Sequence, residues 1–252
     1  MPETPDELVH YDVADAVATI TLDSQHNRNA LSRQLVAELF AALEAAEADP
    51  EVRVVLVRAA GKVFCSGADL SEATADGMEE GARRIVALQR YVVTMSKPVV
   101  LRLHGAVRAG GIGLVAASDV VIADEDATFA LTEVKLGLAA AIISLTVHAR
   151  MNPRAAALTT LGGEVFGGRD AAAYGLVTEA VPGDDLDARV DEVCGQLATG
   201  APQGLRESKA ILNRDLVARI DAHGQEMAAL SARLFASDEA RAAMTAFLNR
   251  KN

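Results

Sequence analysis

The chain has 252 residues, of which 50% are apolar and 4% aromatic, and its formal net charge is −11. A chain of this length suits one large domain, or a domain with an appendage, and can bury a sizeable core of Ala, Val and Leu. The acidic balance argues against a nucleic-acid partner, because nucleic-acid binding requires a basic patch.

The absence of a recognisable targeting signal and the small number of cysteines both favour a cytoplasmic protein. The first seven residues are polar and acidic, without the apolar stretch of a secretory signal. No run of about 18 apolar residues occurs, so no transmembrane helix and no membrane partner are expected. The two cysteines, Cys65 and Cys194, give neither a disulfide framework nor a metal-ligand spacing. We therefore expect a reducing compartment and no metal site.

The N-terminal part of the chain shows mixed strand and helix patterns. A hairpin is predicted over residues 9–22, with its turn at Ala14 and Asp15. A helix that ends near Asp49 is predicted, because the apolar residues of this segment fall on one stripe. Ser32 is suited to cap its start. Further strands are predicted at 53–58, 99–103 and 120–123, and helices at 78–95 and 112–118.

The later part of the chain becomes helical. Pro153 suits the first position of a helix, and Gly162 the position just past its end. Four helices are then predicted without an intervening strand, at 184–199, 202–220, 226–235 and 238–249. Periodicity alone therefore indicates a mixed α/β region followed by an all-helical one.

Two glycine-rich turns, at residues 61–70 and 104–113, each follow a β-branched run. Small residues leave backbone N–H groups uncovered, so two such groups can converge on one oxygen. An enzyme that holds a carbonyl while it becomes an enolate needs this arrangement. A nicotinamide-binding alternative fails on spacing: Gly111, Gly113 and Ala116 resemble its fingerprint, but only about seven helical residues separate the strands, too few for a crossover helix.

Motifs in a characteristic order extend along nearly the whole chain: Asn29-Ala30-Leu31-Ser32, Phe64-Cys65-Ser66-Gly67-Ala68-Asp69-Leu70, His104-Gly105 to Ser118-Asp119, Phe129 with Glu133 and Gly137-Leu138, Ala173-Tyr174-Gly175-Leu176-Val177, and Ala246-Phe247-Leu248. Together they resemble the motifs of the enoyl-CoA hydratase/isomerase family, also called the crotonase family. The run Gly110 to Ala116 is nearest to a bacterial subgroup of methylglutaconyl-CoA-hydratase-like proteins. The resemblance implies an α/β fold, a spiral of ββα turns over residues 1–190, with a helical trimerisation region over 191–252, the two forming one functional unit.

The resemblance assigns catalytic roles to Ala68, Gly110 and Glu133. The backbone N–H groups of Ala68 and Gly110 are expected to form an oxyanion hole for a CoA thioester carbonyl. The alternative is that the glycines only permit tight turns and close helix packing. Glu133 matches a catalytic glutamate, and apolar neighbours would raise its pKa. Its alternative is a solvent-facing glutamate in the first turn of a helix capped by Thr132.

Gly113 departs from the family pattern, because typical hydratases have a second glutamate there that helps to hold the attacking water. A substitute acid from the loop after Leu70 is one possibility, and a solvated helix start is the other interpretation of its acidic residues. A variant with the glutamate restored, Gly113→Glu, is predicted to gain hydratase activity if the side chain fits. The acidic residues in question are Glu72, Asp76, Glu79 and Glu80.

The CoA part of the substrate is expected to lie along two segments and to be the only cofactor-like group required. Arg28 and Lys62 are candidates for its phosphates, with surface solubility as the alternative. Asp69 also suits a helix cap, Cys65 a packing role and His104 a structural role, while Arg108 is expected either to meet a substrate carboxylate or to face solvent. The expected substrate and CoA contacts are Arg28, Ala30, Ser66, Gly67, Asp69, Leu70 and Gly111.

These observations predict an enzyme, most simply an enoyl-CoA hydratase of fatty acid metabolism that acts on a 2-enoyl-CoA thioester. The alternatives are an enoyl-CoA isomerase that uses Glu133 alone and a CoA-binding protein without activity. The resemblance also implies a homotrimer or a dimer of trimers (a hexamer). Apolar residues of the helical tail are expected to contribute to its interfaces, namely Met227, Leu230, Leu234, Met244, Phe247 and Leu248.

Overall fold

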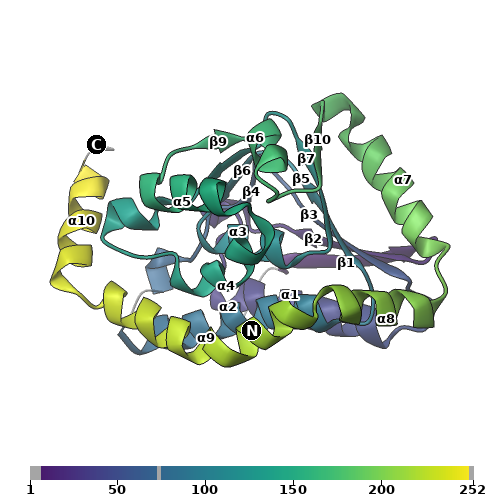
Figure 1. Ribbon diagram of the computed structural model, residues 1–252, viewed down its shortest axis with the longest axis horizontal. Coiled ribbons are helices and arrows are strands. Elements are labelled where there is room, and N and C mark those ends of the chain that lie inside the picture. Colours follow the sequence, from purple (N-terminus) through teal and green to yellow (C-terminus); the bar gives the residue numbers. More distant parts are fainter. Residues whose placement is uncertain (1–6, 73–74, 250–252) are drawn as a thin grey trace, which may run out of the picture.

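The computed structural model describes residues 7–72 and 75–249, and its larger sheet has the strand order β1-β2-β3-β5-β7-β10 (Figure 1). β1 is antiparallel to β2, and the remaining neighbours are parallel. The strands are β1 Val9–Ala14, β2 Val17–Leu22, β3 Val54–Ala59, β5 Val99–Leu103, β7 Val120–Asp124 and β10 Glu179–Val181.

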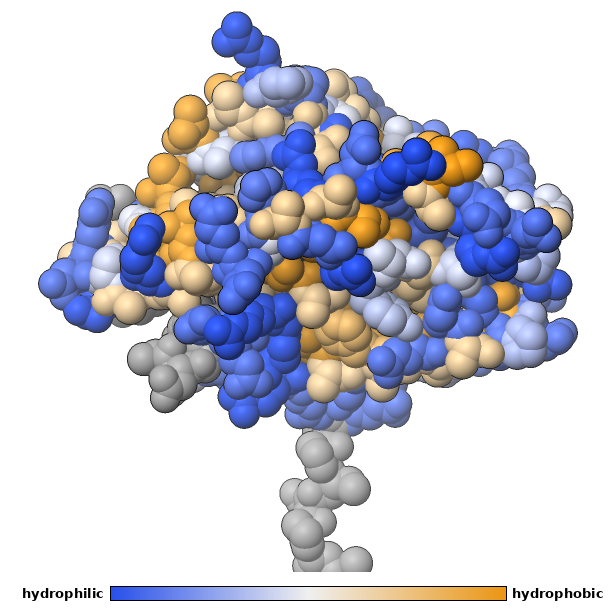
Figure 2. Space-filling view, turned by 60° about the horizontal axis from the view of Figure 1, so that its bottom comes forward, coloured by the Kyte–Doolittle hydropathy of each residue, from blue (hydrophilic) through white to orange (hydrophobic). Residues whose placement is uncertain are grey.

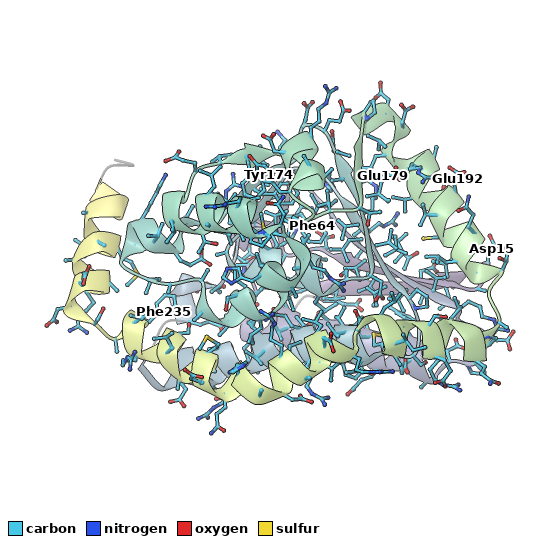
Figure 3. The ribbon with its side chains drawn as sticks, in the orientation of Figure 1. Asp15, Phe64, Tyr174, Glu179, Glu192 and Phe235 are labelled. Atoms are coloured by element: carbon cyan, nitrogen blue, oxygen red, sulfur yellow. The ribbon has the colours of Figure 1, made fainter. Side chains whose placement is uncertain are left out.

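A smaller sheet has the order β4-β6-β8-β9. β4, β6 and β8 run parallel to one another, and β9 is antiparallel to β8. Its strands are β4 Val63–Cys65, β6 Ala106–Arg108, β8 Thr128–Ala130 and β9 Phe166–Gly167. Phe64, on β4, is fully buried, and Figure 3 shows it near the centre of the molecule.

The predicted hairpin forms with its turn one residue later than expected. Ala14 pairs with Val17, so the turn residues are Asp15 and Ala16. Both have positive φ, 50° and 64°, as a two-residue hairpin turn of type I′ requires. The shift of one residue matters because side chains alternate between the two faces of a strand.

The first helix agrees with its predicted cap. Ser32 lies just before α1, and its side-chain oxygen accepts a hydrogen bond from the Leu35 N–H over 3.2 Å. Leu35, Leu39 and Leu43 are all 0% exposed, so the predicted stripe faces the core. The helices up to residue 173 are α1 Arg33–Ala48, α2 Ala75–Thr94, α3 Gly110–Ala117, α4 Ala141–Arg150, α5 Pro153–Gly162 and α6 Gly168–Ala173.

Short helical turns and helix ends complete this region. Pro153 is the first residue of α5, as predicted, but the left-handed residue that ends the helix is Gly163 and not Gly162. The 3₁₀ turns are η1 Gln25–Asn27, η2 Leu70–Glu72, η3 Thr132–Leu136 and η4 Gly183–Asp185.

Four helices end the chain, and two of their predicted boundaries are wrong. They are α7 Leu186–Ala198, α8 Pro202–Leu212, α9 Arg214–Phe235 and α10 Asp238–Asn249. The break falls at Asn213 rather than between residues 220 and 226. Gly224 lies inside α9, where an ideal Cβ would come within 2.8 Å of Val86, so this glycine permits close packing of α9 on α2. The predicted division at residue 190 passes through α7 and stays a prediction.

Helices cover both faces of the larger sheet. Val54 and Leu56 of β3 pack with Val190 of α7 in one apolar cluster, while Val55 and Val57 belong to the main core. Figure 1 shows α7 on the right of the sheet and α9 along the lower edge of the molecule. A sheet buried on both faces explains the continuous apolar runs of its strands. Within the described residues, no helix is both long and apolar enough to cross a membrane.

Candidate active site

Three neighbouring strands of the smaller sheet lead into the predicted catalytic residues. β4 precedes Ala68, β6 precedes Gly110 and β8 precedes Glu133. Because β6 pairs in parallel with both β4 and β8, the segments that follow the three strands leave the sheet at the same edge. Ligand sites of open α/β sheets lie at this carboxyl-terminal edge.

The backbone of Gly110 lies close to the Ala68 nitrogen. A Cβ built on Gly110 would lie 3.9 Å from the Ala68 nitrogen. Gly110 is the first residue of α3, where a backbone N–H has no acceptor within the helix. Leu31 forms a bridge with Ala68, and its N–H donates to the Gly67 carbonyl over 2.8 Å. These bonds fix the first loop beside the start of α3.

The two loops touch where their backbones are unusual. Ala109 has φ 45° and ψ −119°, and such a conformation costs a non-glycine residue about 1–3 kcal/mol. Gly67 has φ 98°, and a Cβ there would lie 3.1 Å from the Ala109 Cβ and 3.2 Å from the Arg108 carbonyl oxygen. Glycine at position 67 therefore permits both the turn and the contact between the loops.

Glu133 lies in η3 with its carboxyl group largely buried. Burial raises the pKa of Glu133 to about 6, as predicted from its apolar neighbours. Its Oε2 has no hydrogen-bond partner among the described residues. The residue before η3 is Leu131, and no side chain caps this turn. The alternative of a solvent-facing glutamate capped by Thr132 is therefore wrong.

A pocket opens beside Ala68. The start of α1 and one face of α2 line it, together with Ile142 of α4 and with Ser231 and Phe235 of α9. Asp69 also lies in its wall, whereas Gly110 and Glu133 are not among its lining residues. Figure 3 shows Phe235 on α9, away from the buried Phe64. Helix α9 thus completes a pocket that begins at the first loop.

A family model for enoyl-CoA hydratase/isomerase matches residues 12–252. The chain belongs to the enoyl-CoA hydratase/isomerase family. The crystal structure of an enoyl-CoA hydratase from Mycobacterium avium is similar, with a TM-score of 0.92, 45% identity and 97% of each chain covered. A Thermus thermophilus protein that bears an enoyl-CoA hydratase name is 37% identical over 202 residues, which are 78% of this chain and 80% of that one.

The relatives also include an isomerase. The peroxisomal Delta(3,5)-Delta(2,4)-dienoyl-CoA isomerase of Arabidopsis thaliana is 27% identical over 260 residues, covering 95% of this chain and 92% of that one. The predicted crotonase-like α/β fold with carboxyl-terminal helices is confirmed by these similarities. The relatives therefore include both enoyl-CoA hydratases and an isomerase.

The segment from Arg28 to Ala30 lies against the first loop. Arg28 is exposed with φ 59°, and its carbonyl accepts a hydrogen bond from the Ser66 N–H over 3.1 Å. Ser66 Oγ donates to the Asn27 carbonyl, and Ala30 is buried. This places Arg28, Ala30 and Ser66 together, and their contact with CoA stays a prediction. The predicted phosphate contact Lys62 is likewise exposed.

Asp69 and Gly111 have structural partners in this fold. Partial burial alone would raise the pKa of Asp69, but hydrogen bonds from Ser71 and Asn27 hold it below its usual value. Asp69 therefore caps η2, as one of its predicted interpretations has it. A Cβ on Gly111 would lie 2.8 Å from the Cys65 Cβ, so this glycine lets α3 pack on β4. The side chain of Leu70 lies outside the described residues.

The departure at Gly113 has a steric cause. An ideal Cβ at this position would lie 2.7 Å from Ile143 Cγ2, and Ile143 is 1% exposed. A branched, buried side chain cannot easily move aside. The condition that a glutamate side chain fits at position 113 is therefore not met in this packing, and the effect of Gly113→Glu on hydratase activity stays a prediction.

The acidic residues after Leu70 have other partners. Both carboxylate oxygens of Glu72 accept from the Arg33 N–H at the start of α1. Glu79 pairs with Arg83, and Glu80 pairs with Arg84. The pairs of Glu79 and Glu80 agree with a solvated helix start. Glu72 also lies in the wall of the pocket beside Ala68, so its role as a substitute acid stays a prediction. The side chain of Asp76 lies outside the described residues.

Arg108 and His104 are turned toward backbone. The Arg108 guanidinium donates to the carbonyls of Val107 and Thr128, so it does not simply face solvent, and its contact with a substrate carboxylate stays a prediction. The Nδ1 atom of His104 accepts from Arg102, so its Nε2 carries the proton and donates to the Gly61 carbonyl over 2.8 Å. His104 thus ties the second loop to the start of the first, a structural role as predicted. Cys65 is fully buried, and burial raises its pKa to about 12, in line with packing.

The sequence did not reveal the supporting contacts of two buried polar residues near the site, Asn29 and Gln89. Asn29 is buried, and its Nδ2 donates to the Ala60 and Val63 carbonyls, which secures the first loop. Gln89 is buried next to Gly113. The family motif marked Asn29 without its partners, and no local pattern distinguished Gln89 from a surface residue of α2.

Proposed function

We propose that this protein is an enoyl-CoA hydratase that adds water to a 2-enoyl-CoA thioester. One observation carries the proposal: adjacent parallel strands lead to the neighbouring backbones of Ala68 and Gly110 and to a buried carboxyl group at one edge of the sheet. In the proposed site, Ala68 and Gly110 bind the thioester oxygen, and Glu133 transfers protons. The family and the hydratase relatives support the same chemistry.

The proposed reaction needs one carboxyl group that changes role. A water oxygen bonds to C3 of the substrate, and Glu133 accepts one proton of that water. The electron pair of the C2–C3 double bond moves toward the thioester, whose oxygen becomes an enolate oxygen held by Ala68 and Gly110. Glu133 then returns the proton to C2, which completes a 3-hydroxyacyl-CoA. A pKa of about 6 leaves Glu133 ionised at neutral pH, as the first step requires.

The rest of the proposal concerns the CoA group. Arg28, Ala30, Ser66, Gly67, Asp69, Leu70 and Gly111 are proposed to contact the substrate or its CoA. Their support is the position of residues 28–31 against the first loop. The substrate brings its own CoA, and the proposed mechanism requires no metal or other cofactor.

A second candidate, an enoyl-CoA isomerase, is favoured by Gly113. Isomerisation moves one proton between C2 and C4, and Glu133 alone suffices for this. The space where a second carboxylate would begin is filled by Ile143, which weakens the case for a water held by two carboxylates. The isomerase among the relatives adds to this alternative.

Mass spectrometry separates these functions. The purified protein is incubated with crotonyl-CoA, longer 2-enoyl-CoA and 3-enoyl-CoA thioesters. A hydratase adds the mass of one water, whereas an isomerase changes retention and leaves the mass unchanged. Binding without any conversion would contradict both and support an inactive CoA-binding protein. Glu133→Gln is the control, since its amide keeps the shape but cannot exchange protons.

The proposed setting is a cytoplasmic homotrimer or dimer of trimers in fatty acid metabolism. Its structural support is an exposed apolar patch, the α5 patch, formed by Leu158, Leu161 and Val165, which are 65%, 75% and 59% exposed. Figure 2 shows apolar atoms gathered on the left of a largely hydrophilic face. Light scattering of the parent and of Leu161→Asp tests the assembly; a monomeric parent would contradict it.

The tail residues predicted for the interfaces are less exposed than the α5 patch. Met227, Leu230, Leu234 and Met244 are half-buried. The side chains of Phe247 and Leu248 lie outside the described residues. Their contribution to an assembly stays a prediction.

A further inference from the structure

Gln89 is a buried polar residue that the proposed chemistry does not use. It lies on α2 and is 1% exposed. Its Nε2 donates to the carbonyls of Ile85 and Ile142, over 3.3 and 3.2 Å, and its Oε1 accepts from Thr146 Oγ1 over 2.6 Å. Both ends of the amide are satisfied, which offsets the cost of its burial. A hydroxyl donor and carbonyl acceptors also fix the orientation of the amide.

The amide lies in the space that the missing side chain of Gly113 leaves free. A Cβ at position 113 would come within 3.1 Å of Gln89 Oε1 and 2.7 Å of Ile143 Cγ2. Gln89 therefore packs directly on α3, the helix that begins with Gly110. We call Gly113, Gln89, Ile143 and Thr146 the Gln89 cluster. It joins α2, α3 and α4 through one set of contacts.

Both carbonyls that Gln89 holds belong to residues of the pocket wall. Ile85 and Ile142 line the pocket that opens beside Ala68. Ile142 is on α4, which begins a few residues after Glu133. Gln89 therefore contacts both the residues of the pocket wall and α3, the helix that begins with Gly110.

We propose that Gln89 is a positioning residue, which holds the acyl group against the Ala68 and Gly110 N–H groups by fixing α2 and α4 on α3. This inference rests on the proposed function. It also relates Gln89 to Gly113, because a Cβ at position 113 would crowd both the Gln89 amide and Ile143. Misplacing a reacting group by about 1 Å costs on the order of 100-fold in rate, so a loose wall affects turnover more than binding of the distant CoA.

The first test changes the amide and keeps its length. Gln89→Met fills similar space without a donor for the Ile142 carbonyl, and Gln89→Glu keeps the shape but places an acceptor against two carbonyls. Each is expected to lower kcat by about 10- to 100-fold while the KM for the thioester stays near the parent value. A parent-like kcat in both folded variants overturns the inference.

A milder pair covers the case in which the Gln89 variants do not fold. Thr146→Val removes the hydroxyl whose shortest hydrogen bond is to the Gln89 amide, with the Gly113 and Ile143 carbonyls farther away, and Thr146→Ser retains it. Thr159→Val is the matched control, since Thr159 is also a buried helical threonine, 4% exposed, but bonds only to carbonyls of its own helix. The kcat should fall in Thr146→Val and not in Thr146→Ser or Thr159→Val. Equal kcat values in the two valine variants overturn the inference.

A spectroscopic readout separates this inference from the proposed function. Cinnamoyl-CoA absorbs at longer wavelength when donors polarise its carbonyl, and the shift requires no turnover. A parent protein that shifts the band without converting any thioester would contradict the proposed function alone. Loss of the shift in Gln89→Met with retained binding supports the positioning role, and an unchanged shift overturns it. A parent that binds without a shift overturns both.

Discussion

Two buried ionisable groups, Lys209 and Glu133, are treated in opposite ways by this fold. Lys209 is 4% exposed, and its Nζ donates to the carbonyls of Val92 and Lys97 and pairs with Asp119 over 2.7 Å. Glu133 has a buried carboxylate oxygen without a partner among the described residues. The lysine has used all three of its donors, whereas the glutamate keeps one oxygen available.

The surroundings of Lys209 extend the contrast. Asp119 also accepts from the Val99 N–H and from Asn213, and Asn213 donates to the Val93 carbonyl as well. Burial lowers the pKa of Lys209, and the charge of Asp119 acts in the opposite direction. Burial raises the pKa of Glu133, and the only opposing effect among the described residues is a hydrogen bond from its own backbone, with no countercharge. A buried charged group whose hydrogen-bonding positions all have partners holds helices and strands together. A buried group with a free position can bind substrate or transfer a proton.

The largest expected effect is on activity at Glu133. Glu133→Gln should lower kcat by about 10²–10⁴-fold, because the amide cannot exchange a proton. Its unfolding transition should stay cooperative. Glu164→Gln is the control, since Glu164 is a nearby exposed carboxylate that pairs with Lys135. Steady-state kinetics of both variants test this, and near-parent turnover in Glu133→Gln would refute its role.

The next effect is on stability at Lys209. Lys209→Met should lower the free energy of unfolding by about 3–5 kcal/mol, because Asp119, whose side chain is only 18% exposed, is left without its countercharge. The kcat of the folded protein should be unchanged. Adding Asp119→Asn should recover part of the loss, since the amide is neutral and keeps an acceptor for Val99. Denaturant titrations measure both; a stability close to that of the parent would contradict the structural role.

The pH dependence of stability distinguishes the two groups further. The pKa of Glu133 is about 6 in the folded protein against an ordinary 4.5. Between these values the folded state binds more protons than the unfolded state, so this group makes stability fall as pH rises. The loss is on the order of 2 kcal/mol and is complete above pH 6. Glu133→Gln should therefore be more stable than the parent at neutral pH and lose this advantage near pH 4. An advantage that does not change with pH would contradict the shift.

The smallest expected effects compare two helical glycines. Gly113→Ala should destabilise by about 1–3 kcal/mol, because its Cβ overlaps Ile143. Gly195→Ala, on α7 with open space around its Cβ, should instead stabilise by about 0.5–1 kcal/mol through helix propensity. Thermal unfolding of both variants provides the measurement. Equal shifts of the same sign would show that the crowding at Gly113 relaxes.

Local physics made much of the fold predictable from the sequence. The Ser32 cap, the leucine stripe of α1 and Pro153 at the start of α5 depend on neighbours within one or two turns. The break at Asn213 depends on groups far along the chain, and Gly224 permits a contact with Val86 on another helix. The periodicity of apolar residues carries no information on such distant contacts, so the predicted boundaries of α8 and α9 were wrong.

The candidate site divides in the same way. Ala68, Gly110 and Glu133 lie in motifs of the family, and their sequence alone suggested roles that stay predictions. The reason for Gly113 lies in Gln89 and Ile143, which come from two other helices. A sequence marks the missing glutamate but not what fills its place.

The contacts between the two loops make them a single unit for engineering. A Cβ at Gly105 would lie 2.1 Å from the Lys62 carbonyl oxygen, and one at Gly67 would meet Ala109. His104 adds its bond to the Gly61 carbonyl. Substitutions in one loop will therefore be non-additive with those in the other. A loop grafted from a relative will fit only with its partner, so exchanges of specificity between family members should transfer residues 61–70 and 104–113 together.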